Sequence, residues 1–204
     1  MKTKIEHFAL GLILAPLAPL AGLLGFWWSS FSFLPEAWVP YCALSGLALG
    51  ILADIFILKR MITRAYKLGL VFWLAVLLFY SVGMFGFFMG VPLFHTALAI
   101  PAGFVVGGKL AHEPVDGVRI RSASLRTCIL TTALLLLVCT ASATVALVSP
   151  STPGDLRGML GLGFEVTRSM IWGLILVGGA GLLAVNWVLT GLSVHIFYRF
   201  LNQP

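Results

Sequence analysis

Six long apolar runs divide the sequence, and they constrain the fold more than any other feature does. A helix needs about 20 consecutive apolar residues to cross the roughly 30 Å of hydrocarbon in a bilayer. Hydrophobic residues make up 60% of the chain and charged residues only 10%, whereas about 25% of a typical soluble domain is charged. We therefore predict an all-α, polytopic integral membrane protein, a six-helix transmembrane bundle. The predicted spans, in one transmembrane domain over residues 1–204, are 8–28, 37–58, 68–90, 91–111, 128–148 and 169–193.

The basic residues predict how this bundle is oriented. If the N-terminus faces the cytoplasm, all but two of the 13 basic residues lie in inner segments, the exceptions being Arg157 and Arg168. Cytoplasmic loops carry such an excess of Lys and Arg, so we expect both termini to be cytoplasmic and the protein to lie in the cell (cytoplasmic) membrane. The net charge of +6 then reflects orientation and contact with anionic lipid headgroups, not a nucleic-acid partner. The residues expected at those headgroups are Lys59, Arg60, Arg64, Lys67, Arg119, Arg121 and Arg126.

Prolines interrupt the first and the fourth apolar runs. Pro16 and Pro19 lie inside the first run, and Pro101 lies inside the fourth. A proline within a helix lacks an N–H and clashes with the carbonyl four residues earlier, which in hydrocarbon then needs a partner from protein or water. We therefore predict that helices 1 and 4 are proline-kinked. An inverted 3+3 repeat would place two such helices in opposite directions, and ordinary kinked helices are the simpler alternative.

Glycines recur at helical spacing in several runs, where they allow two helix backbones to approach closely. Together they predict a compact bundle. Gly90, with Val91 and Pro92, also separates the nearly continuous third and fourth runs, which predicts a tight turn there. The spaced glycines are Gly46 and Gly50, Gly86 and Gly90, Gly103 and Gly107, and Gly173, Gly178, Gly179 and Gly181.

Three polar residues within the spans are candidates for binding a substrate or an ion, because such side chains are costly in lipid and are retained for a function. Asp54 could bind a cation or relay a proton, or it could pair with a nearby base such as Lys59 or Arg60. His95 could titrate near neutral pH, or it could donate a hydrogen bond to a backbone carbonyl. Asn186 could bind a ligand amide, or it could tie two helices together.

Three further histidines, His7, His112 and His195, lie at the inner ends of the first, fourth and sixth runs. With Asp54 and Cys128 they form the one set of residues from which a metal or haem site could be built. No two of these residues have the spacing of metal ligands within one helix. We therefore predict no metal site, and the sequence identifies no cofactor.

The sequence carries no motif that indicates an enzyme. It contains no phosphate-binding GxxxxGK[ST] loop, no GxGxxG after a strand and no CxxC pair. No nucleophile can be matched to a converging base either, so catalysis is not expected.

The outer segment 150–167, between the fifth and sixth spans, mixes polar and apolar residues. After Pro153 it places Asp155 and Arg157 among apolar side chains. This pattern predicts a short interfacial helix or a re-entrant flap. Its glycines would make it pliable, so it could close over an outward-facing cavity as a lid, or it could simply cover the end of the bundle.

We expect a small integral membrane transporter, or a membrane-embedded substrate-binding subunit, for a small molecule or ion that the sequence does not identify. In this hypothesis Asp54, His95 and Asn186 provide the polar contacts. The alternative is a non-catalytic accessory or scaffold subunit of a membrane protein complex, whose partner is another membrane subunit or a second copy of the chain. The first hypothesis predicts a solvated cavity at Asp54 or His95, whereas the second predicts that packing encloses these residues.

Overall fold

The computed structural model describes residues 2–88 and 90–202. Helices make up 88% of the chain and no strand occurs in those ranges, which confirms the all-α prediction. Within them, six helical stretches are long and apolar enough to cross a membrane, so the predicted number of spans is confirmed as well. Residue 89, at the end of the predicted span 68–90, lies outside the described residues. The six stretches are Lys4–Phe33, Glu36–Lys67, Leu70–Phe87, Pro92–Ala111, Gly117–Val148 and Arg168–Asn202.

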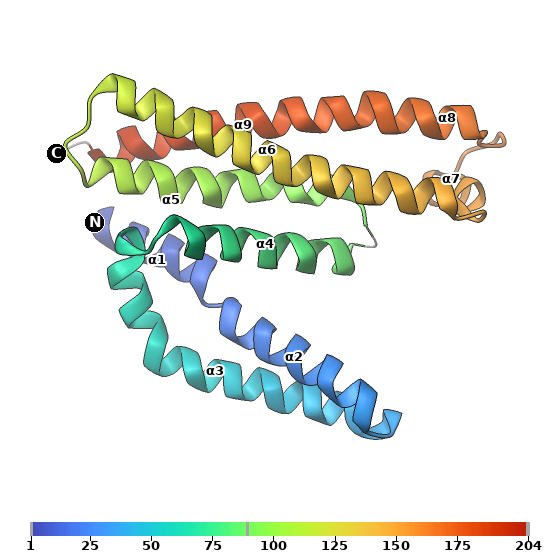
Figure 1. Ribbon diagram of the computed structural model, residues 1–204, viewed down its shortest axis with the longest axis horizontal. Coiled ribbons are helices and arrows are strands. Elements are labelled where there is room, and N and C mark those ends of the chain that lie inside the picture. Colours follow the sequence, from blue (N-terminus) through green and yellow to red (C-terminus); the bar gives the residue numbers. More distant parts are fainter. Residues whose placement is uncertain (1, 89, 203–204) are drawn as a thin grey trace. The chain divides into compact units, whose positions relative to one another are not determined.

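The chain divides into two compact units, Met1–Phe72 and Trp73–Pro204, whose helices are labelled in Figure 1. The first unit contains α1 (Lys2–Leu14), α2 (Leu17–Phe33), η1 (Glu36–Trp38), α3 (Val39–Arg64) and η2 (Ala65–Lys67). The second unit contains most of α4 (Leu70–Phe87), then η3 (Pro92–Leu98), α5 (Ala99–Ala111), α6 (Gly117–Val148), α7 (Thr152–Leu160), α8 (Arg168–Gly173), η4 (Leu174–Gly178) and α9 (Gly179–Asn202).

The first span consists of two helices, because α1 ends at Leu14 and α2 begins at Leu17. Pro16, between them, has no N–H to donate to the carbonyl four residues earlier, so the helical hydrogen bonding stops there. Pro19 is the third residue of α2. The first N–H groups of a helix have no acceptor within the helix, so a proline there removes no helical hydrogen bond. A single interruption therefore accommodates both prolines.

α2 and α3 pack so closely that their backbones meet. A Cβ atom added to Gly22 would overlap the Gly46 carbonyl group, and one added to Gly46 would overlap the Gly22 carbonyl group. Gly50 meets the backbone of Ala18 and Pro19 in the same way. The close helix contact that the spacing of Gly46 and Gly50 predicts is therefore formed inside the chain, between α3 and α2.

A tight turn at Gly90 joins α4 to η3, at the position that the sequence predicts. Gly90 has a φ of 77°, a left-handed conformation that glycine adopts without steric cost. Its N–H donates to the Phe85 carbonyl over 2.8 Å, and the Ser142 hydroxyl on α6 donates to the Gly90 carbonyl. The turn is thus held from both sides, and it sets where η3 starts.

α5, α6 and α9 lie side by side in the second unit (Figure 1). α5 approaches α9 through Gly103 and Gly107, since a Cβ atom on Gly103 would overlap Ser193 and one on Gly107 would overlap the backbone of Val194. Pro101 is the third residue of α5, which follows η3 directly. Its missing N–H therefore falls in the first turn of a helix and not in a helix interior.

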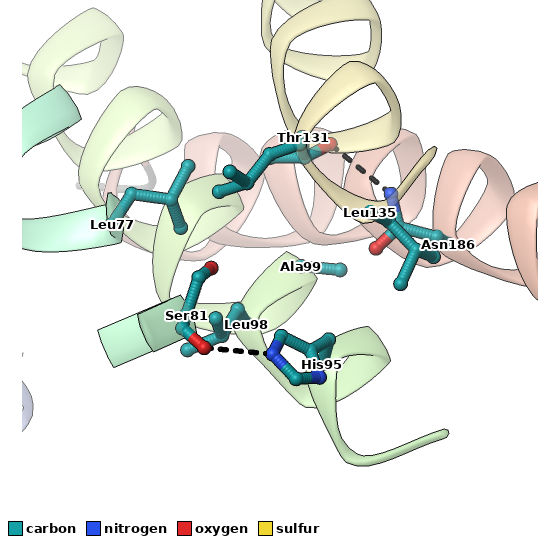
Figure 2. A pocket seen from close by; sticks show the side chains of 9 residues that line it. Leu77, Ser81, His95, Leu98, Ala99, Thr131, Leu135 and Asn186 are labelled. Carbon is teal, nitrogen blue, oxygen red and sulfur yellow. Dashed lines mark hydrogen bonds between the residues drawn. The ribbon is translucent and has the colours of Figure 1, made fainter. Parts of the chain in front are cut away.

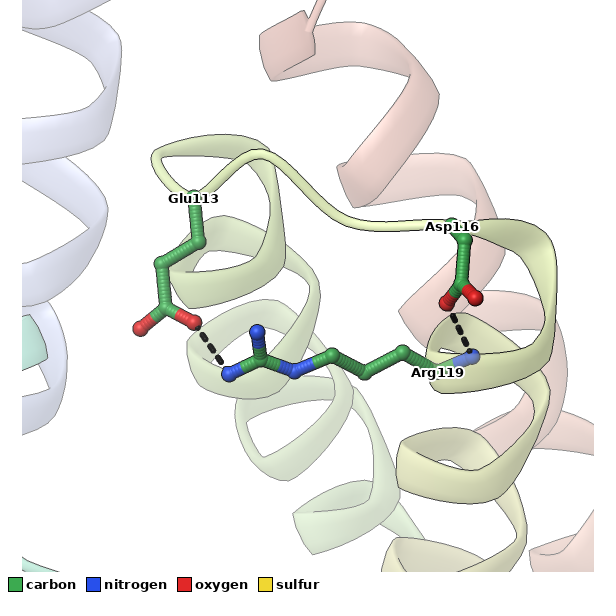
Figure 3. A network of polar contacts seen from close by, with 3 residues as sticks. All are labelled: Glu113, Asp116 and Arg119. Carbon is green, nitrogen blue, oxygen red and sulfur yellow. Dashed lines mark hydrogen bonds and ion pairs between the residues drawn. The ribbon is translucent and has the colours of Figure 1, made fainter.

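Two polar contacts order the loop between α5 and α6 (Figure 3). Asp116 caps α6, because its Oδ1 accepts a 2.9 Å hydrogen bond from the Arg119 N–H. The Arg119 guanidinium pairs with Glu113 over 2.7 Å. Among the predicted headgroup contacts, Arg119 thus has a partner in the chain, whereas the described residues provide none for Arg121 and Arg126.

The segment 150–167 contains a short helix, α7. It is capped by Gly161, which has a φ of 61°, and the Leu162 N–H donates to the Arg157 carbonyl over 3.0 Å. This is the usual way in which a glycine ends a helix. Residues 162–167 form no helix, and the gating role of the segment stays a prediction.

Candidate functional site

A small cavity lined by both polar and apolar side chains lies inside the second unit, where side chains of several helices converge (Figure 2). The volume open to the centre of a water molecule is about 10 Å³, roughly what one buried water requires. The cavity therefore fits one water molecule or an ion of similar size, and it is too small for an organic substrate. Its lining residues are Leu77, Ser81, His95, Leu98, Ala99, Thr131, Leu134, Leu135 and Asn186.

His95 lies in η3, shortly after the Gly90 turn, and only 3% of it is exposed. Its Nε2 atom lies 2.9 Å from the Ser81 carbonyl oxygen on α4. Because a carbonyl oxygen only accepts, Nε2 is the donor in this contact, and in the neutral form of the ring Nδ1 is then an acceptor. The sequence left two alternatives for His95, titration near neutral pH or a hydrogen bond to a backbone carbonyl, and this contact corresponds to the second.

Asn186 ties α9 to α6 near the middle of both spans. Its Nδ2 donates to the hydroxyls of Thr131 (3.3 Å) and Thr132 (3.2 Å). The Thr190 hydroxyl, one turn further along α9, donates to the Asn186 backbone carbonyl over 2.8 Å and lies 3.0 Å from the Thr131 hydroxyl. Asn186 is only 1% exposed, so this cluster is closed off from lipid and its buried donors find acceptors.

Three polar atoms at the cavity keep unused hydrogen-bonding capacity. Ser81 Oγ and His95 Nδ1 are buried without a partner among the described residues, and none of these residues donates to Asn186 Oδ1. A hydroxyl can donate or accept, whereas the bare imidazole nitrogen and the amide oxygen accept. Each buried polar atom left unpaired costs about 1–3 kcal/mol, so a small cation or a molecule with several donors would be stabilised here.

Asp54 lies in α3 of the first unit and is half-buried. No described residue forms an ion pair with it, and neither Lys59 nor Arg60 does so. The structure thus brings His95 and Asn186 to one cavity, while Asp54 belongs to the other unit.

The other three histidines sit near helix ends. His7 is exposed on α1, while His112 Nδ1 lies 2.8 Å from the Gly108 carbonyl and His195 Nδ1 lies 2.8 Å from the Gly191 carbonyl. His112 directly follows α5, where imidazoles often donate to the last carbonyls of a helix, whereas His195 contacts a carbonyl inside α9. Across residues 2–88 and 90–202, no three His, Cys, Asp or Glu side chains form a group that could hold a metal ion.

Sequence reasoning missed the hydroxyl side chains of Ser81 and Thr131, which line the cavity, and that of Thr190, which contacts the Thr131 hydroxyl. One signal was available, because Thr190 follows Asn186 by four residues and so lies on the same face of the helix. It also missed Glu6, a buried carboxyl group of the first unit that interacts with the Tyr66 hydroxyl. Nothing in the sequence indicates that Glu6 and Tyr66 interact, since they lie far apart along the chain.

Comparison of the chain with protein-family models, with curated proteins and with solved structures finds no match. The six apolar helices support a membrane protein. Any more specific function has to be argued from the geometry of the cavity.

Proposed function

We propose that this chain is a small integral membrane transporter, or a membrane-embedded substrate-binding subunit, for a cation of about the size of a water molecule. The observation that carries the proposal is the cavity at His95 and Asn186, where buried polar atoms lack partners. Candidate substrates of this size are hydronium, ammonium and the alkali-metal ions.

The chemistry of the lining favours a cation. His95 Nδ1 and Asn186 Oδ1 are both acceptors, and the Ser81 hydroxyl can turn its oxygen toward a positive charge. No lysine or arginine lines the cavity. A proton could also reside on His95 Nδ1 itself, with a water molecule connecting the ring to the other polar atoms.

The depth of the cluster agrees with such a role. Thr131 and Asn186 lie near the middle of their spans, and transporter sites are commonly found near the bilayer midplane. We further propose that both termini face the cytoplasm, that the interruption beside Pro16 and Pro19 and the junction of η3 and α5 before Pro101 act as bends, and that residues 150–167 cover the outer end of the bundle.

Asp54 is proposed as a separate ion-binding position within the first unit. Its carboxyl group lacks an ion-pair partner among the described residues, and an unpaired ionisable group within a span is a functional candidate by default. Asp54→Asn removes the charge and keeps the shape, so it tests this role without creating a cavity.

The experiment measures transient currents from vesicles containing the purified chain after concentration jumps of H⁺, Na⁺, K⁺ or NH₄⁺. We expect a current for at least one cation that falls at least about ten-fold, or about 1.4 kcal/mol, in Asn186→Leu and in His95→Leu. His112→Gln is the matched control, because that imidazole lies outside the cavity.

A subunit that binds without transporting would give no current. It would instead show a shift of the His95 Nδ1 resonance in ¹⁵N spectra when the same cation is added. If neither the current nor the shift is seen in vesicles where circular dichroism verifies the helices, the proposal is refuted.

A second candidate function, an accessory or scaffold subunit, is favoured by uncovered glycines at the start of the last span. A Cβ atom added to Gly173, Gly179 or Gly181 would meet no described atom within 4 Å. These glycines flank the π-helical turn η4, and small residues allow another membrane helix to approach. The enclosure of His95 and Asn186 by packing also agrees with this candidate.

Native mass spectrometry of the purified chain tests the scaffold candidate. If a second copy of the chain packs on the uncovered glycines, we expect a dimer that Gly179→Leu converts to a monomer, while Gly25→Leu, at an open glycine of α2, leaves it intact. A monomer in every variant would contradict self-association through these glycines.

A further inference from the structure

A second hollow opens on the surface of the second unit, as a groove between α6 and α9. The volume open to the centre of a water molecule is about 360 Å³, so the groove can hold a much larger group than water. Ser124 and Cys128 on α6 are buried at its base, whereas Leu125 and Leu192 are exposed at its sides. The groove exists because small residues, Gly191 among them, occupy the line where the two helices meet.

One end of this groove carries the positive charge of one arginine, and a histidine lies beside it. Arg121, in the first turns of α6, and His195, near the end of α9, both line it and are both exposed. The described residues offer Arg121 no ion-pair partner, in contrast to Arg119, which pairs with Glu113. The His195 Nδ1 contacts the Gly191 carbonyl over 2.8 Å, which leaves Nε2 for another partner.

The other end of the groove is apolar. Beyond the charged end it is lined by Val188 and by Trp187, whose carbonyl oxygen lies 3.6 Å from the Cys128 sulfur. At 1.5 Å per helical residue, Arg121 and Cys128 are about 10 Å apart along the helix, well within one leaflet of a bilayer with about 30 Å of hydrocarbon. The groove thus changes from charged to apolar in the direction of the bilayer centre.

We propose that this groove binds one anionic phospholipid. The phosphate lies at Arg121, beside His195, and an acyl chain follows the groove past Leu125 and Leu192 to Trp187. The charge complementarity of the unpaired guanidinium and the order of polar and apolar surface both match a phospholipid. This site is separate from the water-sized cavity, and the proposal does not depend on the proposed function.

The experiment uses Trp187 as a reporter, since bromine on an acyl chain quenches a tryptophan that it contacts. The full chain is reconstituted in phosphatidylcholine vesicles with increasing fractions of dibrominated phosphatidylglycerol or dibrominated phosphatidylcholine. The Trp187 signal is the difference between the chain and its Trp187→Phe variant. We expect phosphatidylglycerol to bind about five-fold more tightly than phosphatidylcholine, the preference that one arginine near a membrane surface confers.

Three variants separate this site from general surface charge. Arg121→Gln should abolish the preference for phosphatidylglycerol, whereas Arg126→Gln, an exposed arginine of α6 outside the groove, should keep it. Gly191→Leu should reduce quenching by both lipids because its side chain fills the groove; its Cβ would lie 3.6 Å from the Cys128 sulfur, an ordinary contact. Equal binding of the two lipids by the unmodified chain, or the same loss in Arg126→Gln as in Arg121→Gln, would overturn the proposal.

Discussion

Two helix contacts of this chain are held by opposite means. α2 and α3 meet through glycine, with the backbones of Gly22 and Gly46 in direct contact. α6 and α9 are instead joined by hydrogen bonds among Thr131, Asn186 and Thr190. Helices in lipid gain no hydrophobic free energy from association, so close packing and hydrogen bonds are the contributions that their side chains can make. The first contact should be sensitive to added volume, and the second to a lost donor or acceptor.

The largest effect is expected where volume is added to the glycine contact. Gly46→Leu should lower the free energy of opening of α2 and α3 by about 3 kcal/mol, because the new side chain meets backbone atoms that cannot move aside. Amide hydrogen exchange along the two helices measures this opening. Gly25→Leu, on α2 but in open space, should change it by less than about 0.5 kcal/mol. An equal loss in both variants would show that the contact is not the cause.

A smaller effect is expected at the hydrogen-bonded contact. Asn186→Leu keeps the size of the side chain but removes its donors, and it should lower the free energy of opening of α6 and α9 by about 1–2 kcal/mol. Hydrogen exchange of the two helices reports the loss. Thr140→Val is the control, since that hydroxyl bonds only to Leu136 of its own helix. A loss in the control as large as in Asn186→Leu would count against the cross-helix bonds.

A double-mutant cycle sharpens the comparison. Thr131→Val and Asn186→Leu remove the two ends of one hydrogen bond. The double variant should lose about 0.6 kcal/mol less free energy of opening than the sum of the two single losses, which is a typical coupling between membrane helices. Strict additivity in hydrogen exchange would mean that the two side chains stabilise the contact independently.

The smallest effect is expected at the second proline of the first span. Pro19→Ala should change the opening of α2 by less than about 0.5 kcal/mol, because Pro19 already lies in the first turn of that helix. Pro16→Ala restores a donor for the Leu12 carbonyl and should slow hydrogen exchange around residue 16. A larger change in Pro19→Ala than in Pro16→Ala would show that the interruption is centred one turn further along.

Part of the candidate site could be read from single residues. His95 and Asn186 stand out because each is a polar residue inside an apolar run, and each lines the cavity. Thr131 and Ser81 did not stand out, because a hydroxyl can bond to a carbonyl of its own helix and so tolerates lipid without a distant partner. Thr131 and Ser81 contribute to the cavity only because a second helix packs against their own, and no local sequence pattern specifies which helix that is.

The sequence by itself determined that this chain consists of six apolar helices, that the first of them is interrupted beside Pro16, and where Gly90 turns the chain. These are local properties, set by the cost of unpaired backbone groups in lipid and by the backbone geometry of two residue types. Only the tertiary structure decided which glycines meet, that Asn186 bonds across to α6, and that the cavity is no larger than one water molecule. Those features depend on contacts between residues far apart in the chain, where several arrangements of similar helices satisfy the same apolar pattern.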